Sequence, residues 1–199
     1  MKLKLLLFGL LFGTVMAHAQ TNSTPLKVGD LIPDVTLRTE ENKEVSLRKL
    51  VSEKPTVLIF YRGGWCPYCN RHLQSLVGIE DDVNKAGAQL LAISMDQPSK
   101  LRETPNRDKL GYRLFSDSDA IAVKAFGIAF KVDDATVEKY KGYGINLDAA
   151  AGNDHHILPY PAVFIVSTNG VIRFTHVNPD YKVRLEPAKI LEALSASKK

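Results

Sequence analysis

Both cysteines of the chain, Cys66 and Cys69, lie in one stretch that joins two contrasting sequence patterns. An apolar run over residues 56–61 precedes them and is typical of a strand buried on both faces. Apolar residues then recur at roughly helical spacing from residue 73 to about Lys85. The Cys-x-x-Cys pair is therefore predicted to lie where a buried strand turns into a helix, and this unit organises the rest of the chain.

The start of a helix favours a reactive thiol. The first N–H groups of a helix are unpaired and carry partial positive charge, which stabilises a thiolate relative to a thiol. Pro67 fits the first turn, because its missing N–H would have had no partner there. Cys66 is the outer sulfur and the expected nucleophile, whereas the helix is expected to cover Cys69. The spacing predicts a redox-active disulfide.

Other uses of a cysteine pair fit less well, although a pair of inert packed thiols stays open as the alternative. A zinc site needs four ligands, and the chain has no second cysteine pair. Attachment of haem needs a histidine directly after the second cysteine, where the chain has Asn70. A purely structural disulfide would close almost no loop at this spacing and would stabilise the fold little. We expect no metal and no other cofactor.

The N-terminus has the pattern of a secretory signal peptide over residues 1–19. Lys2 and Lys4 precede an apolar run over residues 5–17, and Ala-His-Ala ends at residue 19. A buried helix or a membrane anchor is the alternative, but the apolar run is short for a membrane span. We therefore expect one domain over residues 20–199.

Export would place this domain in the periplasm or another extracytoplasmic compartment, with no membrane attachment after cleavage. The formal net charge of the whole chain is +4, and Lys2 and Lys4 carry two of those charges. The balance of the remaining charges argues against nucleic acid as a partner.

The rest of the chain predicts alternating strands and helices. A strand, a helical crossover and a strand of this length form a right-handed parallel unit. The Asn-Gly pair at 169–170 between two apolar runs predicts a hairpin. The expected elements are a strand ending near residue 37, a helical turn at 46–50, strands at 88–94 and 112–117, helices at 97–110, 119–126 and 186–197, and hairpin strands at 159–166 and 171–177.

Residues 129–158 interrupt this alternation and form an insertion, with a helix expected around 136–140. An insertion of this length is either a functional lid or a connection without a role in function. His155 and His156 could be ligands, but surface histidines are the favoured interpretation.

The motif from Trp65 to Cys69, Trp-Cys-Pro-Tyr-Cys, resembles the active site of the thioredoxin-like superfamily. The patterns at residues 28–37 and 116–128 resemble the alkyl hydroperoxide reductase / thiol-specific antioxidant (AhpC/TSA) branch, which comprises peroxiredoxin-like proteins. The resemblance extends from about Val28 to Leu194. It implies an α/β thioredoxin-like fold with a central mixed sheet flanked by helices, an N-terminal extension and an insertion before the late hairpin.

The resemblance also implies which residues position a substrate. Pro161 falls where thioredoxin-like proteins place a cis-proline facing the dithiol, and Trp65 precedes the first cysteine. In the peroxiredoxin pattern Pro-x-x-x-Thr-x-x-Cys, Cys66 occupies the Thr position and Cys69 the attacking position, and the later Arg falls at Pro161. The family's peroxide-activating set is therefore incomplete here, and Phe60 occupies the position of the buried acid of thioredoxin.

Three arginines could replace the missing cation, by stabilising a thiolate or by polarising a peroxide oxygen. They are Arg62, Arg71 and Arg184, of which Arg62 is nearest to the cysteines in sequence and is favoured. Solvated surface charge is the alternative for all three. His72 is expected to lie on a helix face rather than to act as a base.

Two functions follow for the Cys66/Cys69 dithiol. In the first, an antioxidant peroxidase reduces a hydroperoxide through a sulfenic acid that the second cysteine resolves, and a thioredoxin-like thiol reductant restores the dithiol. In the second, an extracytoplasmic thiol-disulfide oxidoreductase exchanges its dithiol with protein disulfides. A non-catalytic domain is disfavoured, because the only two cysteines form the motif. Helix placement favours Cys66 as the attacking sulfur, whereas the peroxiredoxin alignment places the attack at Cys69.

The signal-peptide pattern predicts that the exported protein begins at Gln20, because Ala-His-Ala immediately precedes it. N-terminal sequencing of exported material tests this expectation. Exported protein that still begins at Met1 would contradict it.

Overall fold

The computed structural model describes residues 24–197, so the signal-peptide pattern at 1–19 lies outside the described residues. Within the described part, no helix is long and apolar enough to cross a membrane.

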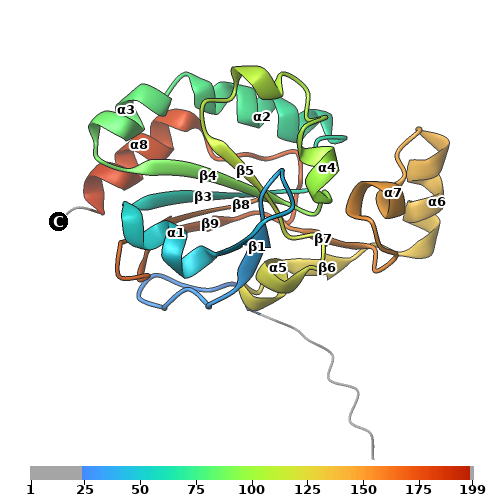
Figure 1. The fold of residues 1–199 in the computed structure, drawn as a ribbon, viewed down its shortest axis with the longest axis horizontal. Helices are drawn as coiled ribbons and strands as arrows, with labels where there is room; N and C mark the ends of the chain where they lie inside the picture. The colour runs from blue at the N-terminus through green and yellow to red at the C-terminus, as the bar shows by residue number, and fades with distance from the viewer. Residues whose placement is uncertain (1–23, 198–199) are drawn as a thin grey trace, which may run out of the picture.

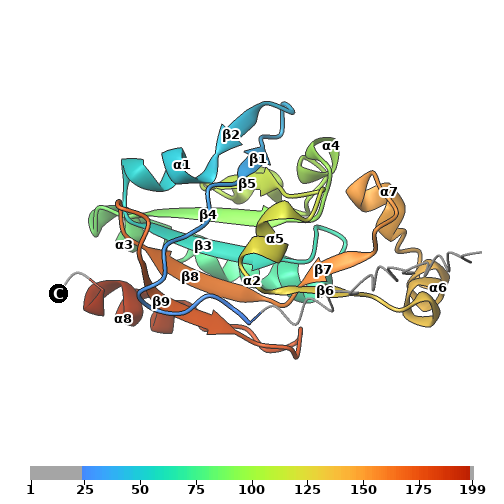
Figure 2. The same cartoon turned by 90° about the horizontal axis from the view of Figure 1, so that it is seen from below.

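A seven-stranded mixed sheet forms the centre of the domain (Figures 1 and 2). Its strands follow the order β2-β1-β5-β4-β3-β8-β9. The parallel pairs are β3 with β4 and β4 with β5, and the other pairs are antiparallel. The bounds are β1 Thr36–Arg38, β2 Glu44–Ser46, β3 Thr56–Tyr61, β4 Gln89–Ser94, β5 Arg113–Ser116, β8 Ala162–Val166 and β9 Ile172–Val177.

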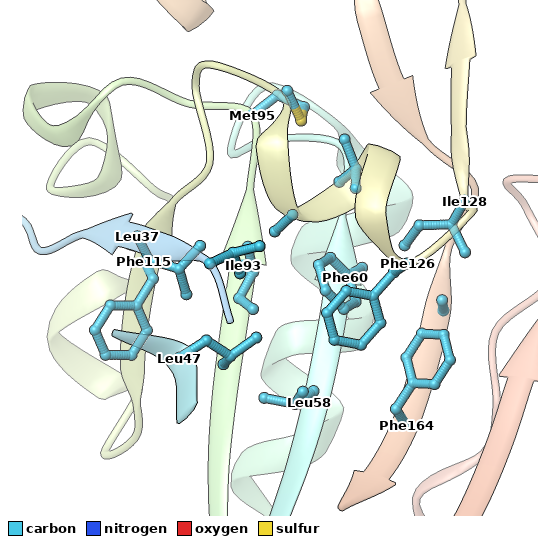
Figure 3. Packing of buried hydrophobic residues seen from close by; sticks show 14 of the residues in the cluster. Leu37, Leu47, Leu58, Phe60, Ile93, Met95, Phe115, Phe126, Ile128 and Phe164 are labelled. Atoms are coloured by element: carbon cyan, nitrogen blue, oxygen red, sulfur yellow. The ribbon is translucent and has the colours of Figure 1, made fainter. Parts of the chain in front are cut away.

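Strand β3 lies inside the sheet and is buried along its whole length, as its apolar run predicts. Successive side chains of a strand point to opposite faces, so β3 contributes to two separate cores. Leu58 and Phe60 pack in one core, and Tyr61 packs in the other. Figure 3 shows Phe60 among Phe126 and Phe164, with ring centroids 4.9 and 5.9 Å from that of Phe60. The end of β3 is thereby held rigidly from both sides.

Helices cover both faces of the sheet. Helices α2, α3 and α8 lie above the sheet in Figure 1, and α1 and α5 lie below it. Ser46 caps α1 by accepting a hydrogen bond from Lys49 N at 3.2 Å, and Pro187 begins α8 as predicted. The bounds are α1 Leu47–Glu53, α2 Pro67–Val77, α3 Glu80–Lys85, α5 Ile121–Ala125 and α8 Pro187–Ala196.

Three helix predictions need correction. The single helix expected to run to Lys85 is broken after Val77 into α2 and α3. The crossover expected to be helical over 97–110 contains only α4 Pro98–Leu101 and one 3₁₀ turn, because Pro105 cannot continue a helix. Helix α5 begins after Asp119, because the Asp117 carboxylate accepts its first N–H groups instead.

The insertion forms a helical subdomain on a two-stranded ribbon, at one end of the molecule (Figure 1). Strands β6 Ala129–Lys131 and β7 Ile157–Pro159 pair antiparallel, and α6 Asp134–Gly142 and α7 Leu147–Ala151 lie between them. Helix α6 covers the predicted helix at 136–140 and is longer, because Asp133 caps it with a hydrogen bond from Thr136 N at 2.9 Å.

The expectation of a cis-proline at Pro161 is wrong, because the described residues contain no cis peptide bond. The chain runs from β7 into β8 at this point. Tyr160 N donates to Ile128 O at 2.8 Å, and Pro161 O accepts from Asn178 N at 3.1 Å. These hydrogen bonds form while the peptide bond between Tyr160 and Pro161 is trans. The trans form is also the lower-energy form for most X-Pro pairs.

Candidate active site around Cys66 and Cys69

The two cysteines occupy the first turn of α2, as the sequence predicts. Cys66 is the N-cap residue with extended backbone, and Pro67 is the first helical residue. Cys66 O accepts the first helical hydrogen bond from Asn70 N at 3.0 Å. The Asn70 side chain also donates to Gly64 O at 2.7 Å, which ties the preceding loop to the helix.

Both sulfurs are buried, which corrects the expectation that Cys66 is the exposed one. Cys66 is 2% exposed and Cys69 is 1% exposed. Both belong to the core cluster of α2 and β3, and Trp65 and Tyr68 pack against that cluster. The helix start therefore supplies its N–H groups but does not by itself give access to solvent.

The two thiols differ sharply in acidity. The hydrogen bond from the Cys69 thiol, then the hydrogen bond from the Cys69 backbone N–H, and then the charges of Arg62 and Arg184 lower the pKa of Cys66 to about 6, although burial opposes this shift. Burial is the largest cause that raises the pKa of Cys69 well above its ordinary value. At neutral pH the pair therefore consists of a Cys66 thiolate that accepts a hydrogen bond from a Cys69 thiol.

Arg184 contacts the second sulfur directly. It lies in the connection between β9 and α8, and its Nη2 donates to Cys69 Sγ at 3.3 Å. Its Nε and Nη1 are buried and have no hydrogen-bond partner among the described residues. Arg184 therefore provides positive charge to the dithiol from a part of the chain more than a hundred residues away.

Arg62 is buried in a cage of aromatic rings. It is 3% exposed, and its Nη2 donates to the Tyr140 hydroxyl. The guanidinium carbon lies 5.0 Å from the ring centroid of Trp65, 5.4 Å from that of Tyr140 and 4.5 Å from that of Tyr181. The insertion supplies Tyr140 and the β9–α8 connection supplies Tyr181, so both segments meet at the active-site loop.

Neither Arg62 nor Arg184 forms an ion pair with a carboxylate within the described residues; the salt bridges there involve other side chains. Both arginines lower the pKa of Cys66. The Cys66 thiolate is thus the anion that these two cations face.

A scan against protein-family models matches residues 28–175 to the family described as "AhpC/TSA family". The match covers well over half of the chain. The chain belongs to the AhpC/TSA family.

Relatives of this family member include peroxiredoxin Bcp of Escherichia coli, which is 31% identical over 104 residues. That match covers 52% of this chain and 66% of the E. coli protein. The chloroplastic peroxiredoxin Q of Suaeda salsa is 26% identical over 83% of this chain and 73% of its own length.

Solved structures show the same thioredoxin-like peroxiredoxin fold. Reduced Prx3 of Vibrio vulnificus in complex with hydrogen peroxide has a TM-score of 0.68 and 19% identity, over 85% of this chain and 99% of that one. Peroxidoxin BcpB of Mycobacterium tuberculosis has a TM-score of 0.66 and 18% identity, over 87% of this chain and 97% of the M. tuberculosis protein. At these identities the likeness shows the fold, so the predicted mixed sheet flanked by helices is confirmed.

This family member also carries a buried carboxyl group that the sequence reasoning missed. Asp96 follows β4 and accepts hydrogen bonds from Gly64 N at 2.7 Å and Ser94 Oγ at 3.2 Å. Burial raises the pKa of Asp96 to about 6, although both hydrogen bonds lower it. Asp96 thus holds the loop before Trp65. Its position beyond the carboxyl end of a parallel strand is a signal that could have identified it.

The predicted histidines do not join the dithiol. His72 is buried, its ring contacts Leu185 O at 3.2 Å, and burial lowers its pKa to about 4, so it is neutral at pH 7. His155 and His156 are half-buried in the insertion and contact Ser118 O and Asp148. Among the described residues, no group of three or more His, Cys, Asp or Glu side chains could hold a metal ion.

We expect Cys69→Ala to raise the pKa of Cys66, because alanine removes the hydrogen bond to the thiolate. A hydrogen bond to a charged group contributes about 1.5–3 kcal/mol, so the expected rise is about one to two pKa units. Cys69→Ser keeps a donor and should raise the pKa less. Ultraviolet absorbance of the thiolate against pH measures both variants. An identical pKa near 6 in both would contradict the paired-thiol arrangement.

Proposed function

We propose that this protein is a thiol peroxidase that reduces hydroperoxides with Cys66 as the attacking sulfur and Cys69 as the resolving sulfur. The observation that carries the proposal is the Cys66 thiolate, held by a Cys69 hydrogen bond and faced by two arginines without carboxylate partners. Membership of a family that includes peroxiredoxins Bcp and Q supports it.

The first step breaks the O–O bond of the hydroperoxide. The Cys66 thiolate attacks the terminal oxygen, and the alkoxide leaves, takes up a proton and becomes an alcohol, or water in the case of hydrogen peroxide. Cys66 is left as a sulfenic acid. With a pKa of about 6, about nine-tenths of Cys66 is thiolate at pH 7, against about 3% for an ordinary thiol with a pKa near 8.5. Arg62 and Arg184 stabilise the charge that develops on the leaving oxygen.

The second step forms the disulfide. Cys69 attacks the sulfur of the Cys66 sulfenic acid, the S–O bond breaks, and water leaves with the thiol proton. The short spacing within one helical turn brings the two sulfurs together without a change of fold. A thiol reductant then restores the dithiol. Hydrogen peroxide bound to reduced Prx3 of Vibrio vulnificus supports a small peroxide as the substrate here.

The surroundings of the sulfurs favour a peroxide over a protein disulfide. A protein disulfide must approach the attacked sulfur with its own backbone, which demands an open surface, and both cysteine residues are at most 2% exposed. A peroxide needs far less space. In this proposal Trp65 and Arg62 line the approach to Cys66, and Pro161 positions the substrate from the start of β8.

The proposed place of action is an extracytoplasmic compartment, because residues 1–19 have the pattern of a secretory signal sequence. The disulfide chemistry suits an oxidising compartment, where a Cys66–Cys69 disulfide would persist until a reductant meets it.

The rate of Cys66 oxidation by hydrogen peroxide should rise as the pH rises through about 6 and then level off. The thiolate is the reactive form, and its fraction is lost as the pH falls through the pKa of Cys66. Stopped-flow fluorescence of Trp65, the only tryptophan of the chain, follows the reaction. Cys69→Ser should accumulate the sulfenic acid on Cys66, and Cys66→Ser should lose the fast phase.

The Cys66→Ser variant also tests whether Cys66 is the attacking sulfur. Mass spectrometry that finds a sulfenic acid on Cys69 in this variant, formed at the wild-type rate, would contradict the assignment of the attacking sulfur. A wild-type protein that consumes peroxide no faster than free cysteine would contradict the peroxidase proposal itself.

A further inference from the structure

Tyr140 joins the insertion to the active-site loop. It lies in α6, three residues after Val137, so both side chains lie on the same face of the helix. Val137 is buried, and Tyr140 packs against the core cluster to which Val137 belongs. This face of α6 therefore packs against the domain, although the insertion as a whole lies at one end of the molecule (Figure 1).

The surrounding backbone holds Tyr140 in a defined position. Where α6 ends, Tyr140 O accepts hydrogen bonds from Tyr143 N and Ile145 N, both at 2.9 Å. On the domain side, Gln97 N donates to Ala150 O in the insertion at 2.8 Å. The insertion is thus tied to the domain by hydrogen bonds, and it presents Tyr140 from an ordered helix.

The Tyr140 side chain contacts two residues of the active-site loop. Its hydroxyl accepts a hydrogen bond from Arg62 Nη2, and its ring centroid lies 5.4 Å from the Arg62 guanidinium carbon. The same ring lies 5.9 Å, centroid to centroid, from that of Trp65. In the described part of the chain the guanidinium donates to no other acceptor, and its Nε is buried without a partner. Because a hydrogen bond is directional, the hydroxyl fixes the orientation of a cation that the ring faces attract.

The orientation of Arg62 matters because its charge acts on Cys66. Both Arg62 and Arg184 lower the pKa of Cys66, and the effect of Arg62 is the larger of the two. Among the described residues, Tyr140 forms no hydrogen bond with either sulfur. The influence of Tyr140 on the thiolate therefore passes through the residues that it contacts.

We propose that Tyr140 is a positioning residue for the dithiol, and that its hydroxyl holds the Arg62 guanidinium in the orientation that faces Cys66. The inference rests on the peroxidase function proposed above for the reaction that this cation assists. It also gives the insertion a role. The later arginine of the peroxiredoxin pattern is replaced by Pro161 here, and Arg62 supplies a positive charge that the insertion supports.

Other groups also act on Cys66 and stay in place in the test. Cys69 in α2 donates hydrogen bonds to it, and Arg184 in the β9–α8 connection adds positive charge. Asp96, after β4, is a nearby carboxyl group, and the charge of Cys66 raises its pKa. In the part of the chain that the structure describes, none of these three residues forms a hydrogen bond with Tyr140.

The test measures the pKa of Cys66 in the reduced full-length protein, by thiolate absorbance and by the pH profile of alkylation with iodoacetamide. Tyr140→Phe keeps the ring and removes the hydroxyl. Arg62→Met removes the cation and should raise the pKa by about one unit, the low end of the shift that a nearby opposite charge produces. Tyr140→Phe should raise it by a smaller amount, roughly a few tenths of a unit, because the cation remains but is held less firmly.

The same Tyr140→Phe change in an Arg62→Met background separates positioning from a general loosening of the site. If Tyr140 acts through Arg62, the two effects are not additive, and the hydroxyl has no further effect once the cation is absent. The double variant should therefore have the pKa of Arg62→Met alone. Tyr143→Phe is the matched control, because Tyr143 lies at the end of α6 and is 67% exposed, and it should leave the value near 6.

An unchanged pKa in Tyr140→Phe would overturn the inference, as would an equal rise in Tyr143→Phe. A rise that persists in the Arg62→Met background would also overturn it, since the effect would then not pass through Arg62. Neither measurement uses peroxide. A protein that shows the expected pKa values but consumes hydrogen peroxide no faster than free cysteine would refute the peroxidase function and leave the positioning role of Tyr140 standing.

Discussion

The site depends on one electrostatic constraint, the placement of two guanidinium groups, the buried one of Arg62 and the half-buried one of Arg184, beside a dithiol. Removing an ion from water costs several kcal/mol, so a buried cation needs a compensating partner. For Arg62 the rings of Trp65, Tyr140 and Tyr181 supply part of that compensation, each contributing about 0.5–2 kcal/mol. The Cys66 thiolate supplies the negative charge. Oxidation to a disulfide removes this charge and leaves both cations unpaired, so the arginines favour the reduced form and make the disulfide a stronger oxidant.

This constraint explains why distant segments meet at the end of β3. The strand and α2 are sufficient to place the two sulfurs, because the strand is buried on both faces and Pro67 begins the helix. Strand β3 and helix α2 do not supply Arg184 or Tyr140, the groups that balance the charges of the thiolate and of Arg62. Tyr140 comes from the insertion, and Arg184 comes from the connection before α8. The insertion therefore contributes to the site through its contact with Arg62.

The sequence predicted those elements that depend on residues close together in the chain. The buried strand at 56–61, the helix start at Pro67 and the hairpin at Asn169-Gly170 all follow from neighbouring residues, and the structure confirms them. Contacts between residues that are far apart in the chain could not be predicted from such local patterns. The contact of Tyr140 with Arg62 was missed for that reason. The expected cis-proline at Pro161 was wrong, because it rested on the superfamily's pattern and not on the hydrogen bonds that hold this connection.

The pKa of Cys66 in a double variant, Arg62→Met with Arg184→Met, tests the central claim most directly. Both cations lower the pKa of Cys66 in the native protein, so the account predicts that each single variant raises it and that the double variant raises it further. Arg173→Met, which removes an exposed arginine on β9, is the control and should leave the value near 6. A double variant whose Cys66 still titrates near 6 would show that the arginines do not hold the thiolate, and would contradict the account.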